Sequence, residues 1–161
     1  MELYTSRYAN PELRSGDYTA VRISLGTPKW PLGYTLDGEC TQLMPYGLLG
    51  KYEDYESFLP AYFERLDRFG PKMISQMLDK YLVHRKDVVL LCYEDIRKGP
   101  SDWCHRTAFA KWMLERTGMV IEELRDPSVP KITKPKAPQK PSLILPEKKA
   151  EEEPMIQLKL F

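Results

Sequence analysis

Hydrophobic residues along the first 126 positions alternate between strand-like and helix-like patterns. Residues 2–5 and 18–24 are short runs, the second rich in Tyr, Thr, Val and Ile, and both favour β-strands. Residues 87–92 read Asp-Val-Val-Leu-Leu-Cys without polar alternation, which predicts a central strand buried on both faces of a parallel sheet covered by helices. Residues 119–124 suit a final short strand.

Three segments between these strands have hydrophobic residues at helical spacing. The first follows a possible N-cap at Asp54 and stops at Gly70, and the second starts at Pro71. The third runs from about Cys104 to Thr117, and Gly118 closes it. This order predicts an α/β fold, in which a small, mostly parallel sheet is flanked by helices in a single domain.

Residues 25–45 form a long segment between the second strand and the first helix. Three glycines and three prolines in it forbid long regular elements, although several large apolar residues there are worth burying. Structured loops of this length are often functional in compact domains.

The composition changes abruptly after Asp126. Residues 127–154 contain seven prolines, clustered lysines and an acidic run, with little apolar surface to bury. Such a composition predicts a disordered tail. The chain therefore divides into an α/β domain at 1–126, a flexible linker at 127–156 and a terminal peptide at 157–161.

Charge and cysteine content limit the classes of function. Residues 1–126 hold 17 Lys and Arg against 19 Asp and Glu, which argues against a broad, non-specific grip on nucleic acid. Three cysteines are too few for a disulfide framework, so we expect reduced thiols. No run approaches the roughly 18 apolar residues of a membrane span. We therefore expect a cytoplasmic protein without a membrane partner.

The residues with the richest chemistry flank the loop between the central strand and the third helix. Ligands of open parallel sheets bind beyond the carboxyl ends of the strands, and a helix N-terminus favours anions and thiolates. We predict that Cys104 is a nucleophile and that His105 or Glu94 carries protons. Arg106 would bind a phosphate, or pair with Glu94 as a structural ion pair.

Structural alternatives exist for the same residues. Cys92 is typical of a small core residue, and Cys104 could serve only in packing or capping. A metal is not expected, because neighbouring Cys104 and His105 cannot easily reach one ion and no second ligand pair stands at finger-like spacing. We also expect no cofactor.

The run Val-Val-Leu-Leu-Cys-Tyr-Glu at 88–94, followed by Cys-His-Arg at 104–106, resembles the bacterial domain-of-unknown-function family number 488. The likeness covers residues 1 to about 126 and includes an early strand with Arg22 before a proline-bearing loop. The family usually has an aspartate just before this arginine, where Ala20-Val21 stands here. The resemblance implies an α/β fold but no particular reaction. It implies a polar site that gathers Arg22, Cys92, Glu94, Cys104, His105 and Arg106.

Arginines and aromatic residues near this edge predict a nucleotide or a nucleic-acid fragment as the ligand. Arg7, Arg22 and Arg106 would hold its phosphate, although Arg7 could equally be a solvated side chain. Four aromatic residues could stack on a base or belong to the rim of the core. They are Tyr8, Trp30, Tyr93 and Trp103.

The last five residues resemble the Gln-Leu-(Ser or Asp)-Leu-Phe peptide with which bacterial replication and repair proteins dock on the sliding clamp. Gln157 and Leu158 match the start of that peptide, while Leu160 and Phe161 would enter a hydrophobic pocket. Lys159 departs from the usual Ser or Asp. The alternative is that these residues form an edge strand or pack on the domain.

Three hypotheses follow from the sequence. The first is a clamp-tethered domain of DNA replication or repair with a thiol-dependent catalytic site. The second is a non-catalytic module that binds nucleotides or nucleic acid. The third is a redox protein that uses Cys92 and Cys104, which requires their Cα atoms to lie within about 7 Å.

Overall fold

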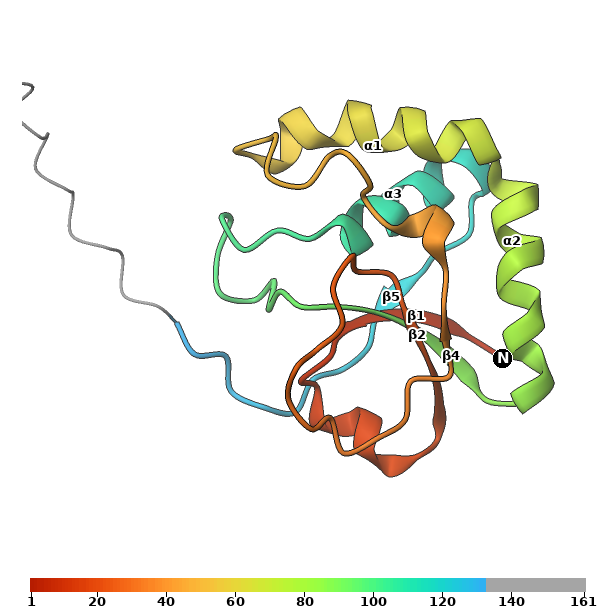
Figure 1. The fold of residues 1–161 in the computed structure, drawn as a ribbon, viewed down its shortest axis with the longest axis vertical. Helices are drawn as coiled ribbons and strands as arrows, with labels where there is room; N and C mark the ends of the chain where they lie inside the picture. The colour runs from red at the N-terminus through yellow and green to blue at the C-terminus, as the bar shows by residue number, and fades with distance from the viewer. Residues whose placement is uncertain (133–161) are drawn as a thin grey trace, which may run out of the picture.

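A computed structural model describes residues 1–132 and contains one five-stranded sheet in which all strands are parallel (Figure 1). The spatial order of the strands is β3-β2-β4-β1-β5. Their bounds are Leu3–Arg7 for β1, Tyr18–Arg22 for β2, Gly38–Glu39 for β3, Asp87–Cys92 for β4 and Glu122–Glu123 for β5. The predicted α/β class with a small parallel sheet is therefore confirmed.

Strand β4 lies at the centre of the sheet, between β1 and β2. Its apolar residues are at most 3% exposed and alternate between two core layers. Val88 and Leu90 pack in the layer beneath the α-helices, and Val89 and Leu91 pack in the layer on the opposite face. The prediction of a central strand buried on both faces is confirmed. The physical reason is that an unbroken apolar run has apolar side chains on both faces of the strand, and both are favourably buried.

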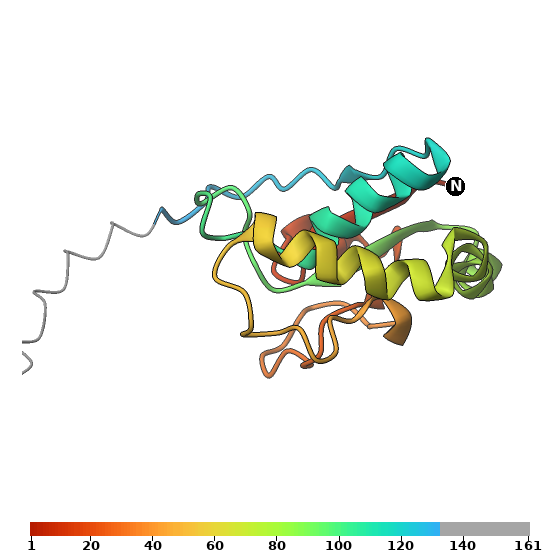
Figure 2. The same ribbon diagram turned by 90° about the horizontal axis from the view of Figure 1, so that it is seen from above.

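All three α-helices cover the same face of the sheet (Figures 1 and 2). They are α1 (Tyr55–Phe69), α2 (Pro71–Asp79) and α3 (His105–Thr117). The side chain of Asp54 caps α1 by accepting a hydrogen bond from the Ser57 amide. Gly70, at φ 79°, makes the sharp turn between α1 and α2. The predicted helix bounds agree with the structure to within a residue or two at the ends of α1 and α3.

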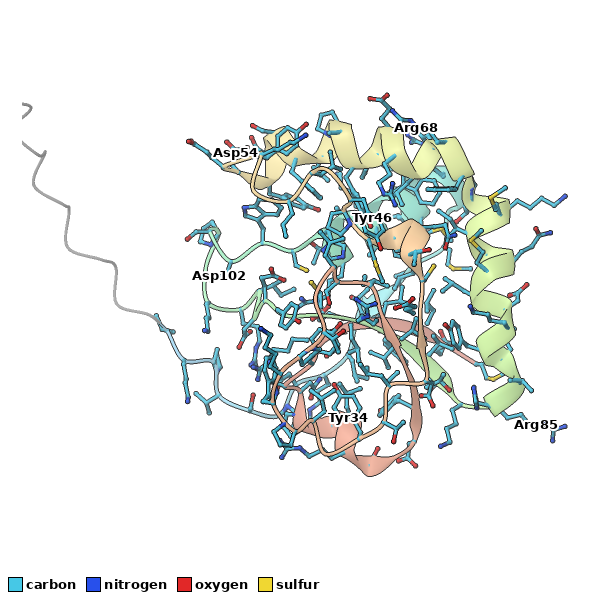
Figure 3. All side chains as sticks on the ribbon, viewed as in Figure 1. Tyr34, Tyr46, Asp54, Arg68, Arg85 and Asp102 are labelled. Carbon is cyan, nitrogen blue, oxygen red and sulfur yellow. The ribbon has the colours of Figure 1, made fainter. Side chains whose placement is uncertain are left out.

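The opposite face is covered by a short 3₁₀-helix, η1 (Pro11–Ser15), and by part of the long loop. Leu13 of η1 packs there with Leu32 and Tyr34, which is labelled in Figure 3. The Tyr34 hydroxyl donates to the Tyr8 carbonyl over 2.7 Å. The α-helices therefore cover one face only, and η1 together with apolar residues of the loop covers the other.

The carboxyl ends of β1, β2 and β4 meet at one edge of the sheet. In the pairing register, Arg7 lies opposite Cys92, and Arg22 lies opposite Leu91. The loop after β4 returns to the same edge, where α3 begins. This edge therefore collects most of the residues for which the sequence predicted chemistry.

Among residues 1–132, none of the helices combines the length and the apolar character needed to cross a membrane. Apart from residues 127–132, the predicted linker at 127–156 and the predicted clamp-binding peptide at 157–161 lie outside the residues that the structure describes.

Candidate functional site

Four side chains from β4 and α3 converge at the carboxyl edge of the sheet. Cys92 is the last residue of β4, and Glu94 follows it by two positions. Cys104 is the N-cap of α3, and His105 is its first residue. We call Cys92, Glu94, Cys104 and His105 the thiol–histidine cluster. The structure thus brings together the three predicted catalytic residues and adds Cys92, which the sequence had favoured as a core residue.

The contacts within the cluster centre on the His105 ring. Its Nδ1 lies 3.6 Å from the Cys92 Sγ and 3.7 Å from the Cys104 Sγ. The Cys92 thiol also donates to Glu94 Oε2 over 3.1 Å. Both cysteines are free thiols, and Cys92, Cys104 and His105 are only 3%, 2% and 6% exposed. At the centre of the cluster, two sulfur atoms that are almost completely buried from solvent therefore lie beside one imidazole nitrogen.

The other nitrogen of His105 fixes the orientation of the ring. Nε2 lies 2.8 Å from the carbonyl oxygen of Ile23, and a carbonyl can only accept, so Nε2 carries a hydrogen. The Tyr62 ring packs edge-on against the imidazole, with 5.8 Å between the ring centroids. In the neutral ring Nδ1 is therefore the bare acceptor, and it faces the two thiols.

The surroundings separate the pKa values of the two thiols. Burial works to raise the pKa of Cys104, but the Cys92 thiol, His105 and Arg106 outweigh it and hold that pKa well below its usual range. The pKa of Cys92 is raised by the hydrogen bond to Cys104, by burial and by Glu94. Cys104 is thus the more acidic thiol of the pair, as its place at a helix N-terminus favours.

The proton carriers of the cluster are shifted in the complementary direction. Burial raises the pKa of Glu94, and the charge of Cys104 adds to the effect. For His105, burial works to lower the pKa, but the attraction of Cys104 outweighs it and the pKa is raised. The shifts at Cys104 and His105 therefore act in favour of proton transfer from the thiol to the imidazole, and the shift at Glu94 acts in favour of its protonated form.

A pocket of about 320 Å³ opens beside the cluster, between the loop before α1 and the loop before α3. Glu94, Cys104 and His105 form part of its wall. The remaining lining includes three aromatic rings and two further carboxylates, and among the described residues it contains no Arg or Lys. The rings are those of Tyr52, Phe58 and Trp103, and the carboxylates are those of Glu53 and Asp102, the last labelled in Figure 3. The pocket is therefore aromatic and acidic.

Arg106 does not turn toward this pocket. Its guanidinium holds Glu123 of β5 with Nε and Nη2, at 3.0 and 2.8 Å from the same carboxylate oxygen. Nη1 is buried without a hydrogen-bond partner among the described residues. The predicted pairing of Arg106 with Glu94 is therefore wrong, since the carboxylate that Arg106 binds belongs to β5.

Arg22 and Arg7 are also held by other groups. Arg22 donates to the carbonyl oxygens of Ser24 and Leu25, each over 2.9 Å, and pairs with Glu39. Arg7 donates to Asp126 and Ser128. Neither arginine lines the pocket, so the structure does not gather the arginines of the predicted phosphate site. Their phosphate-binding role remains a prediction.

The aromatic residues named from the sequence fall into two groups. Trp103 lines the pocket, with its ring 5.0 Å from that of Phe58. Tyr8, Trp30 and Tyr93 form a separate group around the Tyr93 ring, at 5.0 and 5.9 Å between centroids. Tyr93 lines a second, smaller pocket of about 100 Å³, which also contacts Cys92, Glu94 and His105.

The pocket contains residues that sequence reasoning missed. Tyr52 and Glu53 precede α1, and Asp102 lies in the loop before α3. None of them stands in a motif. Asp102 is near the cluster because it precedes Cys104 by two positions, whereas Tyr52 and Glu53 reach the pocket through the packing of α1 beside α3. The carbonyl of Ile23 could not be found either, because a backbone group leaves no signal in the side-chain pattern.

The structure also corrects the sequence argument against a metal. That argument held that neighbouring Cys104 and His105 cannot reach one ion. Their ligand atoms and that of Cys92 all lie within 4.8 Å of one another. The argument is wrong because Cys104 sits at the N-cap, where its extended backbone lets the thiol turn toward Cys92 and the His105 ring.

No family model, curated protein or solved structure matches this chain. The resemblance to family number 488 thus stays a prediction from the motif.

A second group of charges closes the same edge of the sheet. We call Arg7, Asp95, Arg97, Asp126 and Ser128 the C-terminal clasp. Arg97 donates to both oxygens of Asp95 over 2.9 Å and to the Ser128 carbonyl over 2.7 Å. Arg7 donates to Asp126 over 2.7 Å. The contacts of the domain therefore continue past its predicted boundary at Asp126, to Ser128.

The clasp gives a pH-dependent prediction. The hydrogen bonds from Arg97 lower the pKa of Asp95 to about 2, so its stabilising effect is complete above the unfolded value of about 4 and is lost as the pH falls toward 2. We expect Asp95→Asn to lower the free energy of unfolding at pH 7 by about 1–2 kcal/mol, after allowance for solvent screening. Urea unfolding at several pH values measures this difference.

The exposed Asp17→Asn variant is the control for this experiment and should unfold like the parent protein. The difference in free energy of unfolding between Asp95→Asn and the parent protein should become smaller as the pH falls from 4 to 2. A difference that stays constant over this range would contradict the assignment.

Proposed function

We propose that the pocket and the thiol–histidine cluster form a catalytic site for a ring-bearing ligand, such as the base of a nucleotide or of a nucleic-acid strand. The observation that carries the proposal is the arrangement of His105. One ring nitrogen is fixed on the Ile23 carbonyl, and the other faces two buried thiols beside an aromatic pocket. Nucleophilic sites need a thiol whose base is itself held in place.

The cluster supplies the parts for covalent or proton-transfer chemistry. Cys104 is the group that attacks, because it lines the pocket and has the lower pKa of the two thiols. His105 Nδ1 takes its proton, and Glu94 carries a proton to or from the ligand. Cys92 holds Glu94 in place through its hydrogen bond.

The lining of the pocket supports a base better than a phosphate. Tyr52 and Trp103 offer rings for stacking, and Glu53 and Asp102 can accept hydrogen bonds from amino groups. Without Arg or Lys in the described wall, a phosphate would have to remain outside, in solvent. The volume of about 320 Å³ is at the lower end of the range for small-molecule sites.

A second candidate function is a binding module without turnover. The exposed fractions of 2% for Cys104 and 6% for His105 favour it, because a reacting group must be reached by its substrate. In this case the cluster would only shape the wall of the pocket. The two candidates differ in whether the Cys104 thiol is reactive.

We also propose that this protein acts in DNA replication or repair in the cytoplasm, held on the bacterial sliding clamp by its last five residues. Gln157, Leu158, Leu160 and Phe161 would be the contact residues. They lie outside the described residues, so the proposal rests on the sequence motif and on its place at the end of a polar, proline-rich segment.

The ligand class can be tested by thermal shift. Nucleosides should raise the melting temperature of the full-length protein, whereas inorganic phosphate should not. Trp103→Ala should weaken nucleoside binding by about tenfold or more, because one stacking ring is lost. Trp30→Ala is the matched control, since Trp30 is 45% exposed and lies outside the pocket. Equal loss in both variants would contradict the assignment of the pocket.

The reactivity of Cys104 can be tested by alkylation of reduced, chelator-treated protein. Cys104 should react with iodoacetamide about ten times faster than Cys40, and a nucleoside should slow it. Cys40 is a suitable control because it is also buried, lines a pocket of about 330 Å³ and has a pKa raised by burial. Peptide mapping by mass spectrometry gives both rates. If Cys104 reacts no faster than Cys40, the binding module without turnover is the better description.

The docking motif can be tested by deletion of residues 157–161. The shortened protein should lose binding to a purified bacterial clamp in surface plasmon resonance, while its melting temperature stays unchanged. Leu160→Ala with Phe161→Ala should have the same effect, since these residues are the hydrophobic anchors. Clamp binding that survives both changes would rule out this motif as the contact.

A further inference from the structure

Cys92, Cys104 and His105 offer the ligand set that zinc prefers, namely two thiolates and one imidazole. Their ligand atoms come from the end of β4 and the start of α3 and all lie within 4.8 Å of one another. We propose that these three side chains bind one zinc ion, whose fourth position opens to the pocket.

The two sulfur–nitrogen distances fit a tetrahedral site. With Zn–S bonds near 2.3 Å and Zn–N bonds near 2.0–2.1 Å, sulfur and nitrogen ligands lie about 3.6 Å apart. In the cluster, His105 Nδ1 is 3.6 Å from the Cys92 sulfur and 3.7 Å from the Cys104 sulfur. A zinc ion can therefore reach both sulfur–nitrogen pairs with little movement of the side chains.

The hydrogen bond of His105 prepares the ring for a metal. A ligating histidine usually donates its second ring N–H to a carbonyl or carboxylate, which fixes the tautomer and the ring plane. His105 makes this bond from Nε2 to the Ile23 carbonyl over 2.8 Å, so in the neutral ring the lone pair of Nδ1 points toward the thiols. A buried histidine that only filled space would not need its free nitrogen aimed at two sulfur atoms.

Three protein ligands leave one position of a tetrahedral ion free, as in catalytic zinc sites, whereas structural sites use four. Cys104 and His105 line the pocket, so the free position is next to it. Glu94 lines the same pocket, and its Oε2 lies 3.1 Å from the Cys92 sulfur. We assign Glu94 as the proton carrier for a water on the ion, rather than as a fourth ligand.

This inference rests on the proposed function only for the ligand pocket. In the zinc-loaded form Cys92 and Cys104 would be ligands, and the ion would supply an activated water at the pocket in place of the Cys104 thiol. In the metal-free form the thiol remains the attacking group. The acidic, aromatic pocket serves either form.

The test uses the reduced full-length protein, stripped with a chelator, loaded with zinc alone and desalted. Mass spectrometry of the metal content should find one zinc ion per chain. The variants Cys92→Ser, Cys104→Ser and His105→Ala should lose it, whereas Cys40→Ser should keep it, because Cys40 is a buried cysteine outside the cluster. Zinc should also protect Cys92 and Cys104, but not Cys40, from iodoacetamide.

A second measurement covers variants that fail to fold by circular dichroism. Cobalt added to the unmodified protein should give the thiolate-to-cobalt charge-transfer band and the intense visible bands of a tetrahedral ion. Absence of both bound zinc and these bands overturns the metal site, and so does zinc that survives all three substitutions. Neither result changes the alkylation rates of the metal-free protein, which test the thiol chemistry separately.

Discussion

The bond between His105 Nε2 and the Ile23 carbonyl is the contact on which the geometry of the site depends. Ile23 is itself tied to the sheet, because its amide donates to the Leu91 carbonyl over 3.1 Å. The imidazole is thus connected through two backbone hydrogen bonds to the central strand. Because β4 ends only one residue later, at Cys92, the same strand fixes both the ring and the first thiol.

Much of the fold was predictable from the sequence because its main signals are local. The unbroken apolar run of β4, the caps at Asp54 and Gly118, and the turn at Gly70 and Pro71 are local signals, and each is used as the pattern indicated. The meeting of Cys92, Glu94 and the start of α3 followed from the rule that strand ends and helix starts share an edge. The cover of the second face did not follow, because a loop without periodicity gives no sign of where Leu32 and Tyr34 will pack.

The ion pairs were beyond the reach of sequence reasoning. Arg106 and Glu123 are separated by 17 positions, and Arg7 and Asp126 by 119, so no spacing rule connects them. The consequence for function is large. The arginines that seemed free to hold a phosphate are engaged by carboxylates or carbonyl oxygens, and the described pocket wall has carboxylates but no Arg or Lys. The proposed recognition of a ligand in this pocket therefore rests on ring stacking and hydrogen bonding rather than on cationic side chains.

The C-terminal clasp also determines where the chain leaves the domain. Arg7 and Arg97 hold Asp126 and Ser128 against the loop that follows β4, and the end of this loop lines the pocket at Ser101 and Asp102. Figure 1 shows that the described chain therefore leaves the domain on the side of the loop that lines the pocket. On the proposal that a partner binds residues 157–161, that partner would be attached on this side, and the local concentration at the pocket of a substrate that it carries would rise.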